Sequence, residues 1–124
     1  LAKPVVEIAP RTWLISEYKL VNMYLLEGDE AALLIDCGTG IGNAAETVRE
    51  LTDKPLTVAI THGHFDHDGA AALFPEIHLH PLDIKRAMPA VKKRAPGMPK
   101  AAALCATRRR RRKNFWRWCR KTGL

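Results

Sequence analysis

The sequence predicts an α/β domain in which helices pack on a β-sheet. Apolar segments typical of strands alternate with short helical segments between residues 5 and 88. The run Leu56–Ile60 is predominantly apolar, as expected for a strand that is covered on both faces. Asn43 and Glu46 have the spacing of a capping box at the start of a helix.

Four strands are expected between residues 5 and 35. Val5–Ile8 and Trp13–Ser16 are β-compatible segments separated by Pro10. Val21–Glu27 and Ala31–Ile35 flank the sequence Gly-Asp-Glu, which predicts a hairpin.

A turn, three helices and two more strands are expected further along the chain. Glycines at positions 38, 40 and 42 predict a tight turn, because their spacing differs from that of a phosphate-binding G-x-G-x-x-G loop. Ala44, Val48 and Leu51 then recur on one face of a helix. The remaining elements are the strand Leu56–Ile60, an Ala-rich helix over residues 67–73, a strand Glu76–Leu79 and a helix from Pro81 to Met88.

Charge divides the chain into two regions, 1–90 and 91–124. Residues 1–90 hold 7 of the 20 basic residues and all 13 acidic ones, a net charge of −6, whereas residues 91–124 hold 13 basic residues and no acid. No apolar run approaches the roughly 20 residues of a membrane-spanning helix, and no secretory signal is visible. Three widely spaced cysteines favour a reducing, cytoplasmic location.

The region 91–124 has three interpretations. It is the product of a shifted reading frame, a disordered basic tail, or a structured element. A functional tail would bind nucleic acid or an anionic lipid surface, although the acidic region 1–90 argues against a nucleic-acid partner. The residues that would make this contact are Arg108, Arg109, Arg110, Arg111, Arg112 and Lys113.

The pattern H-x-H-x-D-H follows the strand Leu56–Ile60 directly. Alternate side chains of an extended segment face the same way, so His62, His64 and Asp66 can project together, and His67 can reach back from the next turn. Three imidazoles and a carboxylate are the ligands that zinc and related divalent metals prefer. A polar loop with solvated histidines is the alternative interpretation.

These residues resemble the signature of the metallo-β-lactamase fold hydrolases. Thr61–Gly69 resembles the family's metal-binding motif, and Ala31–Gly38 resembles its strand ending in Asp-x-Gly. The resemblance covers about residues 5–88, and Ala70 departs from it where many members carry a second glycine. It implies half of an αββα sandwich, a mixed sheet with helices on one side. The inner face of this sheet would lie open unless a homo-oligomer or a missing C-terminal half covered it.

The resemblance also implies an activity and a ligand set. His62 and His64 would bind one metal ion, and Asp66 and His67 a second; one or two zinc ions are expected, with iron or manganese as alternatives. Metal-bound hydroxide would attack a small ester, thioester, lactone or lactam, and Asp66 would act as a catalytic base. Asp36 would hold a histidine N–H or the loop in place without binding the metal itself. Whether this chain alone is an enzyme stays open, because the family's three downstream ligands are absent from it.

Several assignments are left as alternatives. Asp36 could equally cap a turn, and Cys37 could be a thiolate ligand or part of the core. His80 is either a substitute for a missing ligand or a surface histidine, and His78 shares its strand. Trp13, Tyr24 and Phe65 are core or pocket-rim residues. At the level of function, the alternatives to a hydrolase are a non-catalytic metal-binding remnant and a nucleic-acid or lipid binder.

Overall fold

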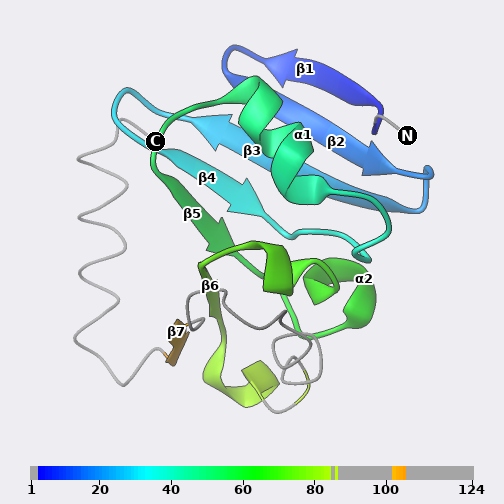
Figure 1. The fold of residues 1–124 in the computed structure, drawn as a ribbon, viewed down its shortest axis with the longest axis vertical. Helices are drawn as coiled ribbons and strands as arrows, with labels where there is room; N and C mark the ends of the chain where they lie inside the picture. The colour runs from blue at the N-terminus through cyan, green and yellow to red at the C-terminus, as the bar shows by residue number, and fades with distance from the viewer. Residues whose placement is uncertain (1–2, 85, 87–101, 106–124) are drawn as a thin grey trace.

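The sheet of the computed structural model has seven strands that follow one another in chain order (Figure 1). The structure describes residues 3–84, 86 and 102–105, the last four by their backbone alone. Pairings from β1 to β4 are antiparallel, and those from β4 to β7 are parallel, so the predicted mixed sheet is confirmed. The strands are β1 (Val5–Ala9), β2 (Thr12–Glu17), β3 (Val21–Glu27), β4 (Ala32–Ile35), β5 (Leu56–Ala59), β6 (Glu76–Leu79) and β7 (Ala102–Cys105).

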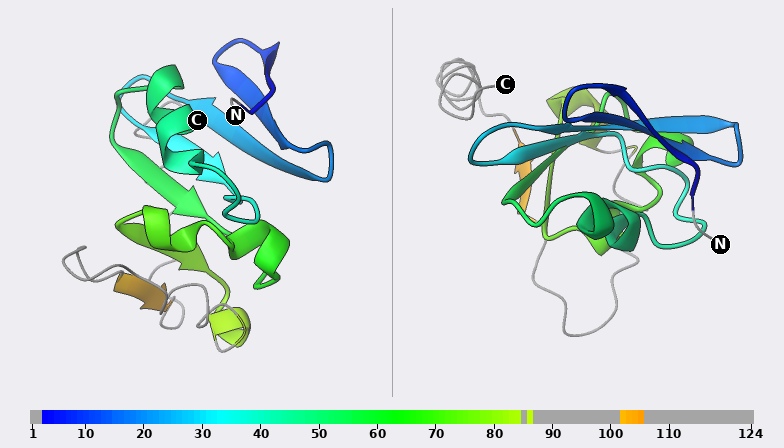
Figure 2. Two further views of the ribbon diagram at one scale, coloured as in Figure 1. Left: turned by 45° about the vertical axis from the view of Figure 1, so that its right-hand side comes forward. Right: turned by 90° about the horizontal axis from the view of Figure 1, so that it is seen from above.

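Helix α1 (Ala44–Leu51) lies against one face of this sheet (Figure 2). Its N-cap is Asn43, whose side chain accepts a hydrogen bond from the Glu46 N–H at 3.1 Å, as the capping pattern predicts. The other helical segments are α2 (Phe65–Asp68) and the 3-10 helices η1 (Ala71–Leu73) and η2 (Pro81–Asp83). No helix in the described ranges is long and apolar enough to cross a membrane.

The predicted helix over residues 67–73 is wrong in its continuity. Helix α2 ends at Asp68, and η1 begins only at Ala71. At this break Gly69 packs on the backbone of Thr39, where a Cβ atom would lie 2.2 Å from the Thr39 carbonyl oxygen. The Ala70 N–H donates a hydrogen bond to the carbonyl oxygen of Gly38 at 3.3 Å. This N–H therefore bonds to the loop that follows β4 and does not continue the helix.

Two further expectations concern the end of the domain. The helix expected from Pro81 to Met88 begins with Pro81 in the first turn of η2, and residues 85, 87 and 88 lie outside the described residues. Strand β7 was not predicted, because charge dominated the interpretation of residues 91–124; its own four residues, Ala-Ala-Leu-Cys, carry no charge. The remainder of that region, including Arg108–Lys113, lies outside the described residues.

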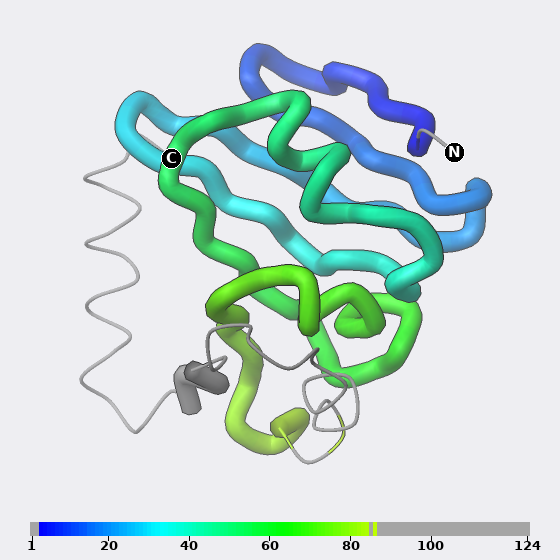
Figure 3. Tube along the Cα trace, viewed as in Figure 1, coloured from blue at the N-terminus to red at the C-terminus, as the bar shows by residue number. Residues whose placement is uncertain are grey.

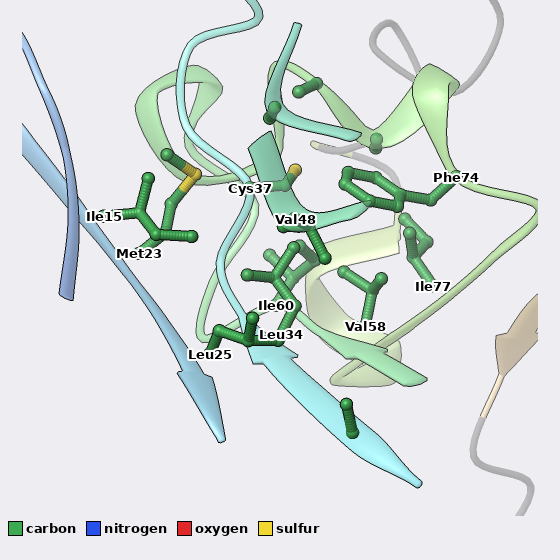
Figure 4. Packing of buried hydrophobic residues seen from close by; sticks show 14 of the residues in the cluster. Ile15, Met23, Leu25, Leu34, Cys37, Val48, Val58, Ile60, Phe74 and Ile77 are labelled. Carbon is green, nitrogen blue, oxygen red and sulfur yellow. The ribbon is translucent and has the colours of Figure 1, made fainter. Parts of the chain in front are cut away.

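The hydrophobic core lies between α1 and the sheet (Figure 4). Each central strand contributes at least one fully buried side chain, and Val48 of α1 and Phe74 pack against them. Burying one large aliphatic side chain stabilises a fold by roughly 1.5–3 kcal/mol, so this layer holds α1 on the sheet. The large apolar strand residues that are fully buried are Ile15, Met23, Leu25, Leu34, Val58 and Ile77.

The opposite face of the sheet carries a second apolar row. Leu14 is paired with Tyr24, Tyr24 with Ile35, and Ile35 with Ala59, so these four side chains cross the sheet on one face. All four are partly or fully exposed. This row lies on the face that the sequence analysis expected to remain open.

Candidate metal centre

The ends of β4 and β5 bring two distant segments together. These two strands are parallel, and Ile35 at the end of β4 is paired with Ala59 at the end of β5. The segments that follow the two strands therefore leave the sheet side by side, at the same edge of the sheet. The Asp36 N–H donates to the Ala59 carbonyl oxygen at 2.9 Å, which continues the ladder by one residue. Figure 3 shows the chain turning at this edge toward α2, whose N-cap residue is His64.

Asp36 is the hydrogen-bonding centre of this edge. Its φ of 58° places it in the left-handed region, which Asp adopts more readily than most residues. The carboxylate is buried and accepts from the Thr61 N–H at 2.8 Å and from the Thr61 hydroxyl at 2.9–3.0 Å. It also lies 2.8 Å from His67 Nδ1.

These contacts determine which ring nitrogens of two histidines carry protons. A carboxylate only accepts hydrogen bonds, so His67 Nδ1 carries a proton that it donates to Asp36, and Nε2 is the ring nitrogen that faces away from Asp36. The hydroxyl of Thr61 has one proton, which it donates to Asp36, so it accepts from His62 Nδ1 at 3.0 Å. Asp36 therefore leaves Nε2 of both His62 and His67 available as a metal ligand.

The three histidines of the motif form one cluster. The ring centroids of His62 and His67 are 4.1 Å apart, and those of His62 and His64 are 4.7 Å apart. The carboxylate of Asp66 lies 3.3 Å from His67 Nε2, on the side of the ring opposite Asp36. All four predicted ligands are thus neighbours, although their role in metal binding stays a prediction.

Arg86 is a member of this site that the sequence analysis missed. Its Nη1 atom lies 3.0 Å from His64 Nε2 and donates to it, because a guanidinium has no acceptor. No motif links residues 64 and 86, so only the folded chain shows the contact. The guanidinium occupies a nitrogen that would otherwise be open to a metal ion.

Cys37 belongs to the core and not to the ligand set. Its side chain is fully buried and its thiol lies 3.2 Å from the His67 carbonyl oxygen. Burial, together with the nearby charges of Asp68 and Asp36, raises the pKa of this thiol to about 12. A thiol with that pKa is protonated at neutral pH, which agrees with its fully buried position in the core.

Asp68 is a second residue that the motif did not predict. It is 2% exposed, and its Oδ2 atom has no hydrogen-bond partner in the structure. Burial raises the pKa of its carboxyl group, and the negative charge of Asp66 adds to the effect. A buried carboxylate oxygen without a partner costs stability, and such groups concentrate near functional sites.

The donor set fits zinc in its chemistry, although the atoms are not arranged around an ion. Among the described residues, no group of three His, Cys, Asp or Glu side chains has the arrangement that would hold a metal. Two imidazoles that share a zinc ion at about 2.0–2.1 Å have ring centroids about 5 Å apart. The rings here are closer than that, as in a packed cluster, and Arg86 occupies His64 Nε2.

The other candidate residues lie away from the cluster's hydrogen bonds. His80 caps η2, where its Nδ1 accepts from the Leu82 N–H at 3.3 Å, and His78 lies 3.4 Å from Glu76 on β6. Trp13 packs against the core, whereas Tyr24 is 37% and Phe65 73% exposed. Neither His80 nor His78 makes a described contact with the motif histidines.

Comparison with known proteins gives the family of the chain. Residues 18–98 match the profile of the metallo-beta-lactamase superfamily. The chain is 31% identical over 68 residues to the acyl-coenzyme A thioesterase MBLAC2 of Gallus gallus, an alignment that covers 48% of this chain and 24% of that protein. The chain therefore belongs to the metallo-beta-lactamase superfamily.

Solved structures show the same fold at lower sequence identity. The metallo-beta-lactamase of Hirschia baltica superposes with a TM-score of 0.64 and 20% identity, covering 86% of this chain and 53% of that one. The metallo-beta-lactamase FIM-1 of Pseudomonas aeruginosa, in its mono-zinc form, gives 0.60 and 16%, with 83% and 50% covered. The chain thus spans about half the length of these structures and a quarter of the thioesterase.

Proposed function

We propose that this chain is the metal-binding half of a zinc-dependent hydrolase that acts on a small ester, thioester, lactone or lactam. The observation that carries the proposal is the cluster of His62, His64 and His67 beside Asp66, with two of its rings oriented by Asp36. Superfamily members typically bind zinc. A bound zinc ion would supply Lewis acidity that lowers the pKa of a water molecule to about 7.

The chain's own residues would prepare the site for that chemistry. Asp36 holds His67 through Nδ1 and holds His62 through the Thr61 hydroxyl, so neither contact uses the Nε2 atom of either ring. Orienting contacts of this kind typically change metal affinity by 10–100-fold. Asp66, beside His67 Nε2, would accept a proton from the attacking water and hold that water in place.

A thioester is the substrate that we favour within this class. The support is the relative in Gallus gallus, which is named an acyl-coenzyme A thioesterase and shares 31% identity over the aligned residues. The alignment covers 24% of that protein, so pocket residues outside it decide which acyl group would be accepted.

The competing proposal is a metal-binding remnant without turnover. It is favoured by the absence of an arranged ligand set among the described residues. The hydrolase proposal, in contrast, requires the family's three further ligands to come from residues outside this sequence or from another chain. A remnant would bind zinc weakly and hydrolyse nothing.

Two measurements on the full chain separate these proposals. Cobalt titration followed by absorption spectroscopy reports the ligand set, and release of free thiol from short acyl-coenzyme A substrates reports turnover. We expect His62→Ala and His67→Ala to weaken cobalt binding, whereas His80→Ala, which alters an exposed histidine outside the cluster, leaves it unchanged. Cobalt binding without thiol release supports the remnant, and absence of binding excludes both proposals.

A further inference from the structure

A cavity of about 300 Å³ is lined by none of the residues of the histidine cluster. It is formed where β1 begins and β2 ends, beside the loop that leads into α1. Its volume is at the lower end of the range for small-molecule sites and equals about ten water molecules. The lining residues are Lys3, Pro4, Ser16, Glu17, Tyr18, Lys19 and Ile41.

The cavity has a fixed ion pair in its wall. Lys3 Nζ donates to Glu17 Oε1 and, at 2.9 Å, to the Ile41 carbonyl oxygen, while the Thr39 N–H donates to Glu17 Oε2 at 2.6 Å. Glu17 is 1% exposed, so this pair is buried. Both carboxylate oxygens are used within the protein, and the charges of Lys3 and Glu17 cancel.

The mouth of the cavity lies at an unusual turn. Tyr18 and Lys19 have φ values of 54° and 59°, and the Leu20 N–H bonds to the Glu17 carbonyl oxygen at 3.0 Å. Two successive positive φ values are those of a type I′ turn, where Asn-Gly is the usual pair. Placing Tyr and Lys there costs about 1 kcal/mol or more for each residue, and it brings both of them to the cavity.

The chemistry of the lining selects a class of ligand. Pro4, the Tyr18 ring and Ile41 supply apolar walls, and the latter two are 53% and 58% exposed. Lys19 forms no ion pair among the described residues, so its positive charge remains after Lys3 and Glu17 have cancelled. Apolar walls beside one uncompensated cation suit a molecule with an apolar body and one negative charge.

We propose that this cavity is a binding site for a small amphiphilic monoanion of the medium-chain carboxylate type. The apolar chain would lie between Tyr18 and Ile41, and the carboxylate would bind the Lys19 ammonium. The lining includes no residue of the histidine cluster, so octanoate binding can be tested independently of the hydrolase activity.

The test is a titration of the full chain with octanoate, followed by two-dimensional ¹⁵N–¹H NMR. We expect saturable shifts centred on Ser16–Lys19 and Ile41, with a dissociation constant on the order of 1 mM, as for a ligand of about ten non-hydrogen atoms. Lys19→Asp should weaken octanoate binding about fivefold or more, since Asp tolerates the left-handed backbone of this turn. Lys19→Asn, which only removes the charge, should give a smaller loss.

Matched variants make the outcome decisive. Ile41→Asp should abolish binding, whereas Leu20→Asp, the same kind of change at an 85% exposed residue outside the lining, should leave it unchanged. The double variant His62→Ala/His64→Ala should bind octanoate like the wild type. The proposal is overturned if octanoate causes no saturable shifts, if Ile41→Asp and Leu20→Asp behave alike, or if the double histidine variant loses binding.

Discussion

Asp36→Asn is the substitution that most directly tests how the histidine cluster is oriented. An amide keeps the size of the side chain, and Asn tolerates the φ of 58° at this position. Its oxygen can still accept from Thr61. Its NH₂ group, however, would face His67 Nδ1 at 2.8 Å, where a second donor cannot be accommodated. His67 must then move its proton to Nε2, so that Nδ1 becomes the acceptor.

The structure gives two magnitudes for this change. A charge-assisted hydrogen bond of a buried carboxylate is replaced by a neutral one, which should lower the free energy of unfolding by about 1–2 kcal/mol. A protonated Nε2 has no lone pair for a metal, so the affinity for zinc should fall by about 10–100-fold. The His67 ring remains packed beside His62, which limits the loss of folding stability. The loss of zinc affinity should therefore be the larger of the two effects.

Three measurements check this prediction. Long-range ¹⁵N–¹H spectra report the tautomer of His67, competition with a chromophoric chelator gives the zinc affinity, and urea denaturation with a chelator present gives the stability. Asp53→Asn, at an exposed aspartate, is the matched control. Wild-type zinc affinity in Asp36→Asn, with the proton still on His67 Nδ1, would refute the argument that Asp36 sets the available nitrogen.

Three other substitutions test contacts elsewhere in the fold. Burial alone would raise the pKa of Glu17, but hydrogen bonds from Lys3 and Thr39 lower it below its ordinary value of 4.5. The Lys3–Glu17 pair should therefore stabilise the fold above about pH 4.5, and this stabilisation should be lost as the pH falls through the lower pKa of the folded state. Glu17→Gln should lower the free energy of unfolding by about 2–3 kcal/mol at pH 7 and flatten the acid limb of a stability–pH curve. Arg86→Ala should raise zinc affinity severalfold, measured by the same chelator competition, because it frees His64 Nε2; unchanged affinity would show that the guanidinium does not compete. Asp68→Asn should raise stability by about 1 kcal/mol in urea denaturation, since it removes a buried charge with an unpartnered oxygen, and a loss of stability would contradict this account.

The sequence predicted those parts of the fold that depend on local chemistry. The helix cap at Asn43, the hairpin between β3 and β4, and the glycine turn all follow from residues close to one another in the chain. The break between α2 and η1 could not be predicted in this way. It depends on Gly69 meeting the backbone of Thr39, a contact between residues 30 positions apart.

The same distinction applies to the candidate site. The motif placed His62, His64, Asp66 and His67 within six residues, so local spacing sufficed to group them. The partners that set their hydrogen bonds come from elsewhere: Asp36 from the end of β4, and Arg86 from beyond β6. No spacing rule links such residues, because the parallel pairing of β4 with β5 creates their proximity.

The sheet order, in which each strand pairs with its neighbours in sequence, bears on how the polypeptide acquires its structure during synthesis. No strand must be inserted between two that are already paired. As the chain leaves the ribosome, β1 to β4 can associate by closing only short loops, and β5 can then dock with α1 already in place. Nascent-chain stalling at successive lengths would therefore show stepwise growth of protection, one strand at a time, with the histidine motif ordered soon after β5 emerges.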